Sequence, residues 1–297
     1  PKFRNIQDHW TAYGDIKGRV SNFESKNLTF YFGRRSKIFG EVGLDGLPNI
    51  SETFIEFDLE NSILHPDDIR QYLTSDKHYT KFKKFGKIDF SARFNGFPSQ
   101  FTTKGKFKTA LGYLEADIQF KINQDLGHSE YEGKLFTDEF QLGSFLDNKT
   151  VGAINLDGKI EGHGFTINDA QLDMNAEVHK FELLDYPYQG INIDGHLENK
   201  YFKGKLLIDD PNIQLRSKGQ VDFRETNQEI ILLAEIEKAN MKALNFTKDS
   251  LLISTILDVD FKGFSLDEII GKGDLRKTYI SQNDKHISID EFKFSSF

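Results

Sequence analysis

The sequence predicts an all-β fold, an antiparallel meander with a few short helices, and three observations predict it. Apolar and polar residues alternate through most of the chain, as they do in strands that bury one face. Turn-forming residues separate these stretches at short intervals. Several stretches open on a Gly that shares the parity of the apolar residues, which indicates one strand unit used repeatedly. These openings are Gly86-Lys87-Ile88, Gly105-Lys106-Phe107, Gly133-Lys134-Leu135, Gly158-Lys159-Ile160, Gly204-Lys205-Leu206 and Gly219-Gln220-Val221.

The alternation defines the expected strands, about 20 of them in sequence. Charged or amide side chains fill the positions between the apolar ones, so one face of the sheet is expected to be wet. Strands of a parallel α/β sheet are continuous apolar runs instead, which argues against that class. The clearest apolar positions are Ile88, Phe90, Ala92 and Phe94; Leu114, Ala116, Ile118, Phe120 and Ile122; Leu172, Met174, Ala176 and Val178; Ile191, Ile193 and Leu197; Ile213, Leu215, Val221 and Phe223; and Leu251, Ile253, Leu257, Val259 and Phe261.

Turns and short helices are expected between the strands. Pro66 and the acids after it suit the first turn of a helix from His65 to Leu73. Ser265 and Glu268 form a capping-box pattern before a helix closed by Gly271. Two further helices are expected from Thr137, as N-cap, to Leu146 and from Ala239 to Asn245. The turn signals are Asp45–Asn49, Asn95–Pro98, Asp125–Gly127, Asn199-Lys200, Asp209–Asn212 and Gln282–Asp284.

Composition excludes several classes of protein. The 38 Lys and Arg against 46 Asp and Glu give a net charge of −8, whereas nucleic-acid binding needs a basic footprint. The chain has no Cys, so disulfide scaffolds, thiolate zinc sites and Cys nucleophiles are excluded. No apolar run approaches the length of a membrane-spanning helix. The 28 Phe residues, against two Met and one Trp, indicate an apolar face built largely from rings.

Motifs for catalysis or metal binding are absent from the sequence. No nucleophile elbow, phosphate loop or dinucleotide fingerprint occurs, and the Gly-x-Gly pairs at Gly162 and Gly271 are expected to be turns. The His residues lack metal-ligand spacing, and no Glu follows the acids around Pro211 at the spacing of a calcium loop. We therefore expect no enzyme activity, no cofactor and no metal, although a glycosidase carboxylate pair is not excluded by sequence. The basic clusters Arg34-Arg35 and Lys81–Lys84 are expected on solvated faces or sheet edges, with contact to anionic head groups as the alternative.

Five passages, in order, carry a resemblance to a known family: Gly33–Lys37 with Glu41–Pro48, Ile154–Gly164, Gly190–Asp210 with Pro211-Asn212, Lys218–Phe223, and Ala243–Leu251. In these passages the chain resembles the TamB and AsmA-like envelope proteins, in particular the TamB-type proteins (translocation and assembly module) of the Bacteroidota. The similarity runs roughly from Asp15 to Phe297. Because the family is defined by degenerate β repeats, the order of the passages is more specific than any one of them.

The resemblance implies a stack of strands rolled into an elongated open groove with an apolar lining, a β-taco or repeating β-groove. Family members are anchored in the inner membrane, cross the periplasm of Gram-negative bacteria and end in a C-terminal domain near the outer membrane. They are similar to bridge-like lipid transfer proteins and are also implicated in assembling outer-membrane β-barrel proteins with a barrel partner. The family has no catalytic residues. Since the first residue is Pro and neither anchor nor C-terminal domain is recognisable, residues 1–297 are expected to be one continuous groove segment from the middle of a longer chain.

The functional expectation is therefore a periplasmic conduit in which an apolar groove carries the acyl chains of phospholipids between membranes. Two alternatives stay open: a scaffold for outer-membrane proteins, and a secreted glycan-binding or glycan-cleaving β protein. A closed β-sandwich would show the same one-sided alternation as an open groove. The expected groove residues, assigned by parity, are Ile88, Phe90, Phe94, Phe107, Leu114, Ile118, Phe120, Leu172, Met174, Val178, Ile191, Ile193, Leu206, Ile208, Val221, Phe223, Leu257, Val259 and Phe261.

Overall fold

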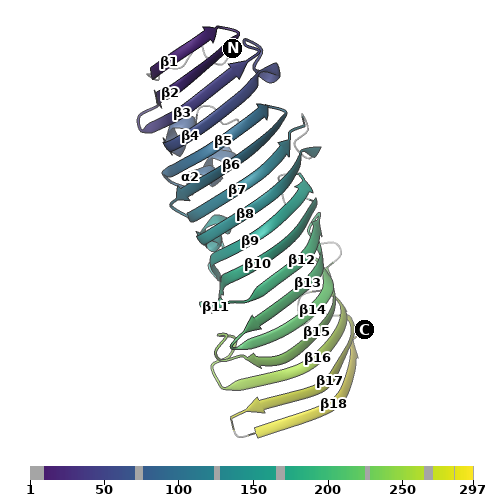
Figure 1. The fold of residues 1–297 in the computed structure, drawn as a ribbon. Helices are drawn as coiled ribbons and strands as arrows, with labels where there is room; N and C mark the ends of the chain where they lie inside the picture. Colours follow the sequence, from purple (N-terminus) through teal and green to yellow (C-terminus); the bar gives the residue numbers. More distant parts are fainter. Residues whose placement is uncertain are drawn as a thin grey trace. The chain divides into compact units, whose positions relative to one another are not determined.

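The computed structural model describes residues 10–70, 76–123, 128–164, 171–224, 228–263, 270–283 and 285–296 (Figure 1). The chain divides into two compact units. The N-terminal unit comprises Pro1–Gln124 and Glu130–Asn148, and the C-terminal unit comprises Asp125–Ser129 and Lys149–Phe297. None of the helices in the described part of the chain combines the length and apolar character that crossing a membrane would take.

The N-terminal unit is an antiparallel meander in which each strand pairs with the next along the chain. Short helices lie between some of its strands or follow the last one. The strands are β1 (Thr11–Arg19), β2 (Asn22–Phe32), β3 (Ser36–Asp45), β4 (Phe54–Leu64), β5 (Ile88–Phe97), β6 (Gln100–Thr109), β7 (Gly112–Lys121) and β8 (Glu130–Gln141). The helices are the 3₁₀ turn η2 (Ile50–Glu52), α1 (Pro66–Ile69), α2 (Asp76–Lys83) and α3 (Leu142–Leu146).

The C-terminal unit repeats this plan. Its strands also pair in antiparallel sequence, except that β10 pairs with β9, with the short β11 and with β12. The strands are β9 (Val151–His163), β10 (Gln171–Leu183), β11 (Tyr186–Tyr188), β12 (Ile191–Glu198), β13 (Tyr201–Asp210), β14 (Ile213–Asp222), β15 (Glu229–Asn240), β16 (Leu251–Lys262), β17 (Ile270–Gln282) and β18 (Lys285–Ser296).

The predicted fold class is confirmed: the described chain is an all-β antiparallel meander with a few short helices, and its sheets stay open. In the described residues of each unit, no pairing joins the first strand to the last. The alternation specifies these strands because a side-chain period of two places every apolar residue of a strand on one face.

β-Bulges bend both sheets along a line. Register shifts fall between Ser25 and Leu28, Lys37 and Gly40, and Leu59 and Ser62 on successive strands of the N-terminal unit. Equivalent shifts interrupt β10, β15 and β16 in the C-terminal unit. The shift in β2 falls at mid-strand, and the others lie toward the same side of their sheet, the side at which β4 ends in one unit and β10 and β15 end in the other. A bulge sharpens the local bend of a strand, so aligned bulges crease a sheet.

The short helices were predicted less well than the strands. Helix α1 begins at Pro66 as expected, but the expected N-cap Thr137 lies inside β8, and α3 begins only at Leu142. Ala239 and Asn240 end β15 and are followed by turns rather than a helix. Gly271 lies inside β17, so it neither closes a helix nor forms a turn, and Gly162 likewise lies inside β9. At Thr137, Gly162 and Gly271 the strand pairing outcompetes a weak helix or turn signal. Residues 71–73, 125–127, 265–269 and 284 of the expected helices and turns lie outside the described residues.

Candidate functional site: two apolar sheet faces

The apolar face of the N-terminal unit is built from rows of side chains that run across the strands. Cross-strand register aligns residues of equal parity, so each row crosses several strands. The rings along these rows contact one another: Phe94 and Phe101 stack with ring centroids 4.5 Å apart, and Phe101 and Phe120 follow at 5.1 Å. Two of these rows are Phe57–Phe94–Thr103–Ile118–Gly133 and Phe90–Phe107–Leu114–Thr137.

The apolar face of the C-terminal unit has longer rows and more aliphatic side chains. One row holds only large apolar residues over six strands, and a second is broken only by small residues. These rows are Leu172–Leu197–Phe202–Val221–Ile230–Phe261 and Ala176–Ile193–Leu206–Ser217–Ala234–Leu257–Leu275. A third row is Val178–Ile191–Ile208–Leu215–Ile236.

The structure places the expected groove residues on these two faces, with one difference. Most are partly exposed rather than buried: Phe90, Phe94, Phe107, Leu114, Phe120, Leu172, Met174, Ile193, Leu206, Ile208, Val221, Leu257 and Phe261. The buried ones are Ile88, Ile118, Val178, Ile191 and Val259. Phe223 differs because β14 ends at Asp222, so this residue lies beyond the ladder and is 53% exposed. Partial exposure of whole apolar rows is not what the dry interface of a tightly packed sandwich would give.

Glycines on the apolar faces give aromatic rings room to lie flat against the sheet. A Cβ at Gly195 would come 2.5 Å from the ring of Phe202 on the next strand, and one at Gly273 would come 2.3 Å from Phe294. A Cβ at Gly105 would meet the Phe107 ring at 2.7 Å. These distances are below van der Waals contact, so only glycine allows the observed ring positions. Of the repeated glycines, ring packing explains Gly105, whereas a Cβ at Gly133 or Gly219 would first meet the backbone of the neighbouring strand, at 2.1 and 2.3 Å.

One side of the N-terminal sheet is sealed by an aromatic cluster, here named the N-terminal seam (Phe82, Phe85, Leu111, Phe140 and Phe145). It lies where β6 and β8 end. Ring centroids of Phe85 and Phe145 are 5.8 Å apart, and those of Phe140 and Phe145 are 6.0 Å apart. Leu111 is buried beside them. The alternation of the strands does not reveal this cluster, although the spacing of Phe82 and Phe85 is that of neighbours on one helix face.

The corresponding side of the C-terminal sheet is sealed by the connection between β15 and β16. Leu244 of this connection is fully buried against Val178, Tyr188 and Ile191, a cluster here named the C-terminal seam. The side-chain amide of Asn245 donates to the carbonyl oxygen of Leu184 over 2.8 Å and fixes the connection across the sheet. The alternation could not reveal Leu244, because it lies in an irregular segment outside any strand.

On the opposite side of each sheet, the described apolar side chains are partly exposed. In the N-terminal unit these are Phe101 and Phe120. In the C-terminal unit Leu172, Phe202 and Phe261 occupy this side and are all partly exposed. Within the described residues, each apolar face is therefore covered by a packed cluster along one side, the seam side, and carries partly exposed side chains along the other, which we name the margin.

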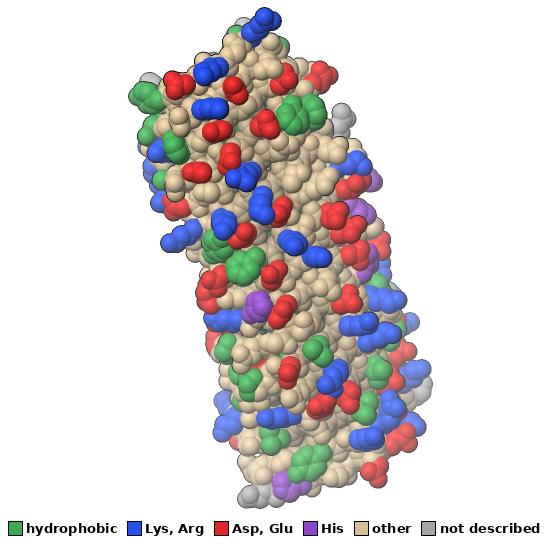
Figure 2. All heavy atoms as spheres, in the orientation of Figure 1, with side chains coloured by type: hydrophobic (Ala, Val, Ile, Leu, Met, Phe, Trp, Pro, Cys, Tyr) green, Lys and Arg blue, Asp and Glu red, His purple; other side chains and the backbone are tan. Residues whose placement is uncertain are grey.

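The other face of each sheet is polar and carries charges of both signs. Arg93 pairs with Asp58 at 3.0 Å and Lys104 with Asp117 at 2.8 Å across neighbouring strands of the N-terminal unit. Figure 2 shows Lys, Arg, Asp and Glu side chains interspersed over the side of the molecule in view. A hollow of ≈ 290 Å³ on the polar face of the N-terminal unit has charged lining residues that include Asp58, Arg93 and Lys104. Such a lining does not suit an acyl chain, so the apolar faces are the candidate site.

No catalytic or metal-binding constellation emerges from the described ranges. Their His, Asp and Glu residues contain no group of three or more that could hold a metal ion. The buried acid Asp210 is engaged in local structure, since it accepts hydrogen bonds from the Tyr186 hydroxyl at 2.5 Å and the backbone N–H of Asn212 at 2.8 Å. Burial and the hydrogen bond to Asp210 raise the pKa of Tyr186 above its ordinary value.

Comparison with known proteins adds no relative to this description. The chain matches no family model, no curated protein and no solved structure. The observations that bear on function are therefore the geometry of the two apolar faces and the resemblance described above.

Proposed function

We propose that this chain is a segment of a lipid-transfer conduit, in which the apolar faces hold the acyl chains of phospholipids that move through the periplasm between the inner and outer membranes. The observation that carries the proposal is the partial exposure of continuous apolar rows in both units. The resemblance to TamB and AsmA-like proteins supports the same function.

The energetics explain why such a surface is useful. A methylene group in water costs about 0.8 kcal/mol, so an acyl chain of about 15 methylenes costs roughly 12 kcal/mol. Rows of Phe, Leu, Ile and Val remove most of this cost while the head group stays hydrated. No step in this process needs catalysis, so direction and energy have to come from other components.

The asymmetry of each unit fits this use. The seam side is closed by Leu244 in the C-terminal unit and by Phe140 with Phe145 in the N-terminal unit. The margin leaves Phe261 and Phe120 partly exposed. An acyl chain can lie along the rows with its head group at the margin, in contact with water, without burying any charge.

A scaffold for nascent outer-membrane strands is the second candidate, and the edge strand β18 favours it. Its side chains Ile287 and Phe292 are 54% and 50% exposed. An exposed strand edge with apolar side chains can add a strand from another protein. This candidate predicts binding at an edge, whereas the conduit predicts binding over the apolar faces.

Lipid bound by the purified protein tests the conduit. Phe120→Glu with Phe261→Glu introduces charges at the margins of both faces, and Leu207→Glu with Leu233→Glu is the matched control. Leu207 and Leu233 are 38% and 48% exposed and lie on the polar face of the C-terminal unit. We expect phospholipid in the extract of the wild type and the control and at least a fivefold loss in the double Phe variant, with similar urea midpoints. Absence of phospholipid from the wild type, or equal loss in both variants, contradicts the proposal.

A further inference from the structure

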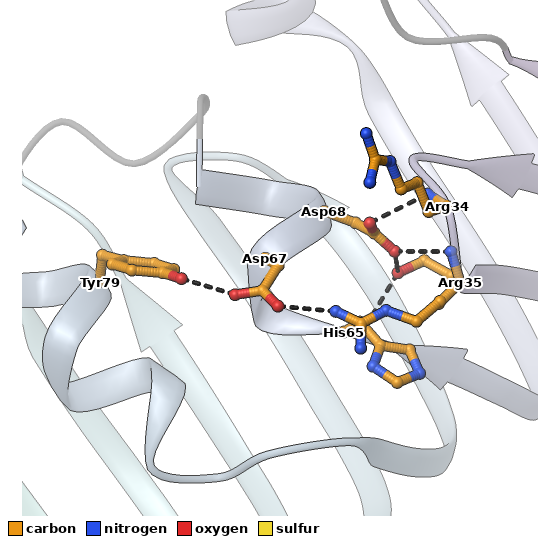
Figure 3. A network of polar contacts seen from close by, with 7 residues as sticks. Arg34, Arg35, His65, Asp67, Asp68 and Tyr79 are labelled. Atoms are coloured by element: carbon orange, nitrogen blue, oxygen red, sulfur yellow. Dashed lines mark hydrogen bonds and ion pairs between the residues drawn. The ribbon is translucent and has the colours of Figure 1, made fainter.

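The fold brings the two basic clusters of the N-terminal unit together. Arg34 and Arg35 lie in the turn between β2 and β3, and Lys81 and Lys83 lie on α2. Asp67 of α1 joins the two segments: it receives hydrogen bonds from the Arg35 guanidinium and the Tyr79 hydroxyl, both at 2.6 Å (Figure 3). The hydrogen bond from Tyr79 and then that from Arg35 hold the pKa of Asp67 below its usual range.

The second carboxylate of α1 fixes the Arg34-Arg35 turn and leaves the Arg34 side chain uninvolved. Asp68 is buried and accepts hydrogen bonds from the backbone N–H groups of Arg34 and Arg35, both at 3.0 Å, and from the Ser36 hydroxyl at 2.8 Å. These donors hold the carboxylate, which keeps its charge, buried beneath the turn. In Figure 3 the Arg34 guanidinium points away from both carboxylates.

The result is a positive area on an acidic chain, here named the basic surface (Arg34, Arg35, Arg70, Lys81 and Lys83). All five side chains are exposed; of the described acids beside them, Asp67 is exposed and Asp68 is buried. The guanidinium of Arg70 lies 4.9 Å from the Tyr79 ring centroid and the Lys83 ammonium lies 5.9 Å from it. Cations placed around an aromatic ring with a polar tip are typical of surfaces that meet the membrane interface.

We propose that the basic surface docks this protein on anionic phospholipid head groups at a membrane surface. Charge complementarity between this surface and anionic head groups supports the proposal. Because the net charge of the whole chain is −8, attraction to an anionic membrane has to come from a local patch of this kind. The same net charge disfavours nucleic acid, whose long backbone would meet the acidic remainder of the chain. The surface lies on the seam side of its unit, so docking is independent of lipid bound at the margin.

Vesicle co-sedimentation of the full chain tests the docking. Vesicles of phosphatidylcholine alone are compared with vesicles that contain about one third phosphatidylglycerol. The test variant is Arg34→Glu with Lys81→Glu and Lys83→Glu, and the control is Lys203→Glu with Lys205→Glu and Lys218→Glu, which has the same net charge and changes exposed residues on the polar face of the C-terminal unit. Each basic contact contributes about fivefold to partitioning, so the test variant should bind anionic vesicles roughly 100-fold less than wild type.

The expected pattern is binding of the wild type and the control to anionic vesicles, weakened by salt, and little binding to neutral ones. Equal loss of binding in both triple variants means that net charge acts rather than this surface, and overturns the proposal. So does equal binding to neutral vesicles. If the test variant loses binding to soluble polyglutamate but not to vesicles, the surface recognises acidic protein instead. Urea midpoints of both variants confirm folding, and the result is independent of whether lipid co-purifies.

Discussion

At the scale of single residues, phenylalanine rings of the apolar faces pack over glycines. The Phe202 ring lies where a side chain at Gly195 would project, and Phe294 lies over Gly273 in the same way. A ring that lies flat covers backbone that would otherwise be open and leaves the apolar face smooth. The sequence shows the parity of these glycines but not the ring that covers each of them, because the ring comes from another strand or another position.

Gly195→Ala tests this pairing. The new Cβ would lie 2.5 Å from the Phe202 ring, so the ring must move, and we expect a loss of about 1–3 kcal/mol in the free energy of unfolding. Gly43→Ala is the control, because its Cβ would meet only Glu56, at 3.6 Å. Urea unfolding should show a change of about 0.5 kcal/mol or less for the control. Equal effects of the two substitutions would mean that the ring is not held by the glycine.

The titration of Asp68 is a second residue-scale prediction. Burial alone would raise the pKa of this carboxyl, but hydrogen bonds from Arg34, Ser36 and Arg35 outweigh it and lower the pKa. A carboxyl with a lowered pKa in the folded state stabilises the protein above its ordinary pKa of about 3.9, and this contribution is lost as pH falls through the folded-state pKa.

Asp68→Asn removes that titration. We expect the variant to be less stable at neutral pH by about 1–3 kcal/mol, because an amide replaces a charged acceptor of three hydrogen bonds. Between about pH 5 and about pH 2 its free energy of unfolding should fall less steeply than that of the wild type. Parallel pH profiles for the two proteins in urea unfolding would rule out this role for Asp68.

At the scale of elements, the strands could be predicted and the seams could not. The alternation around Ile118 or Val221 predicts the strand from local sequence alone, because successive side chains of a strand point to opposite faces of the sheet. Bulges such as that between Leu59 and Ser62 switch the parity within a strand, and their local signal is weak: here it is Asn61, whose φ of 47° is one that Asn adopts more readily than most residues. The seams depend on segments distant in sequence, as where Leu244 meets Val178. Helices as short as α1 and α3 follow tertiary contacts rather than propensity, which explains the misplaced start at Thr137.

Leu244→Ala tests whether the C-terminal seam holds its sheet. The side chain is fully buried, so its truncation should cost about 2–5 kcal/mol in the free energy of unfolding. Phe246→Ala is the matched control, because Phe246 lies in the same connection but is 50% exposed. Hydrogen exchange should show faster exchange of the Tyr188 and Ile191 amides in Leu244→Ala. Similar stability of the two variants would mean that the connection does not seal the sheet.

At the scale of the whole molecule, the described residues of each unit form an open sheet with one apolar face, one polar face, one sealed side and one margin of partly exposed side chains. The expectation that residues 1–297 form one continuous groove stays a prediction, because neither unit by itself tests it. The conduit account needs both apolar faces to be occupied by acyl chains, whereas the scaffold account needs only a strand edge.

Site-specific photo-crosslinking in cells tests the conduit most directly. A photoreactive amino acid is placed on the apolar faces at Phe90, Phe120 or Val221 and, as controls, on the polar face at Leu207 or Leu233. The account predicts adducts with phospholipid at the three apolar-face positions and none at the controls. Equal yields on both faces, or adducts only with unfolded outer-membrane proteins, would contradict it.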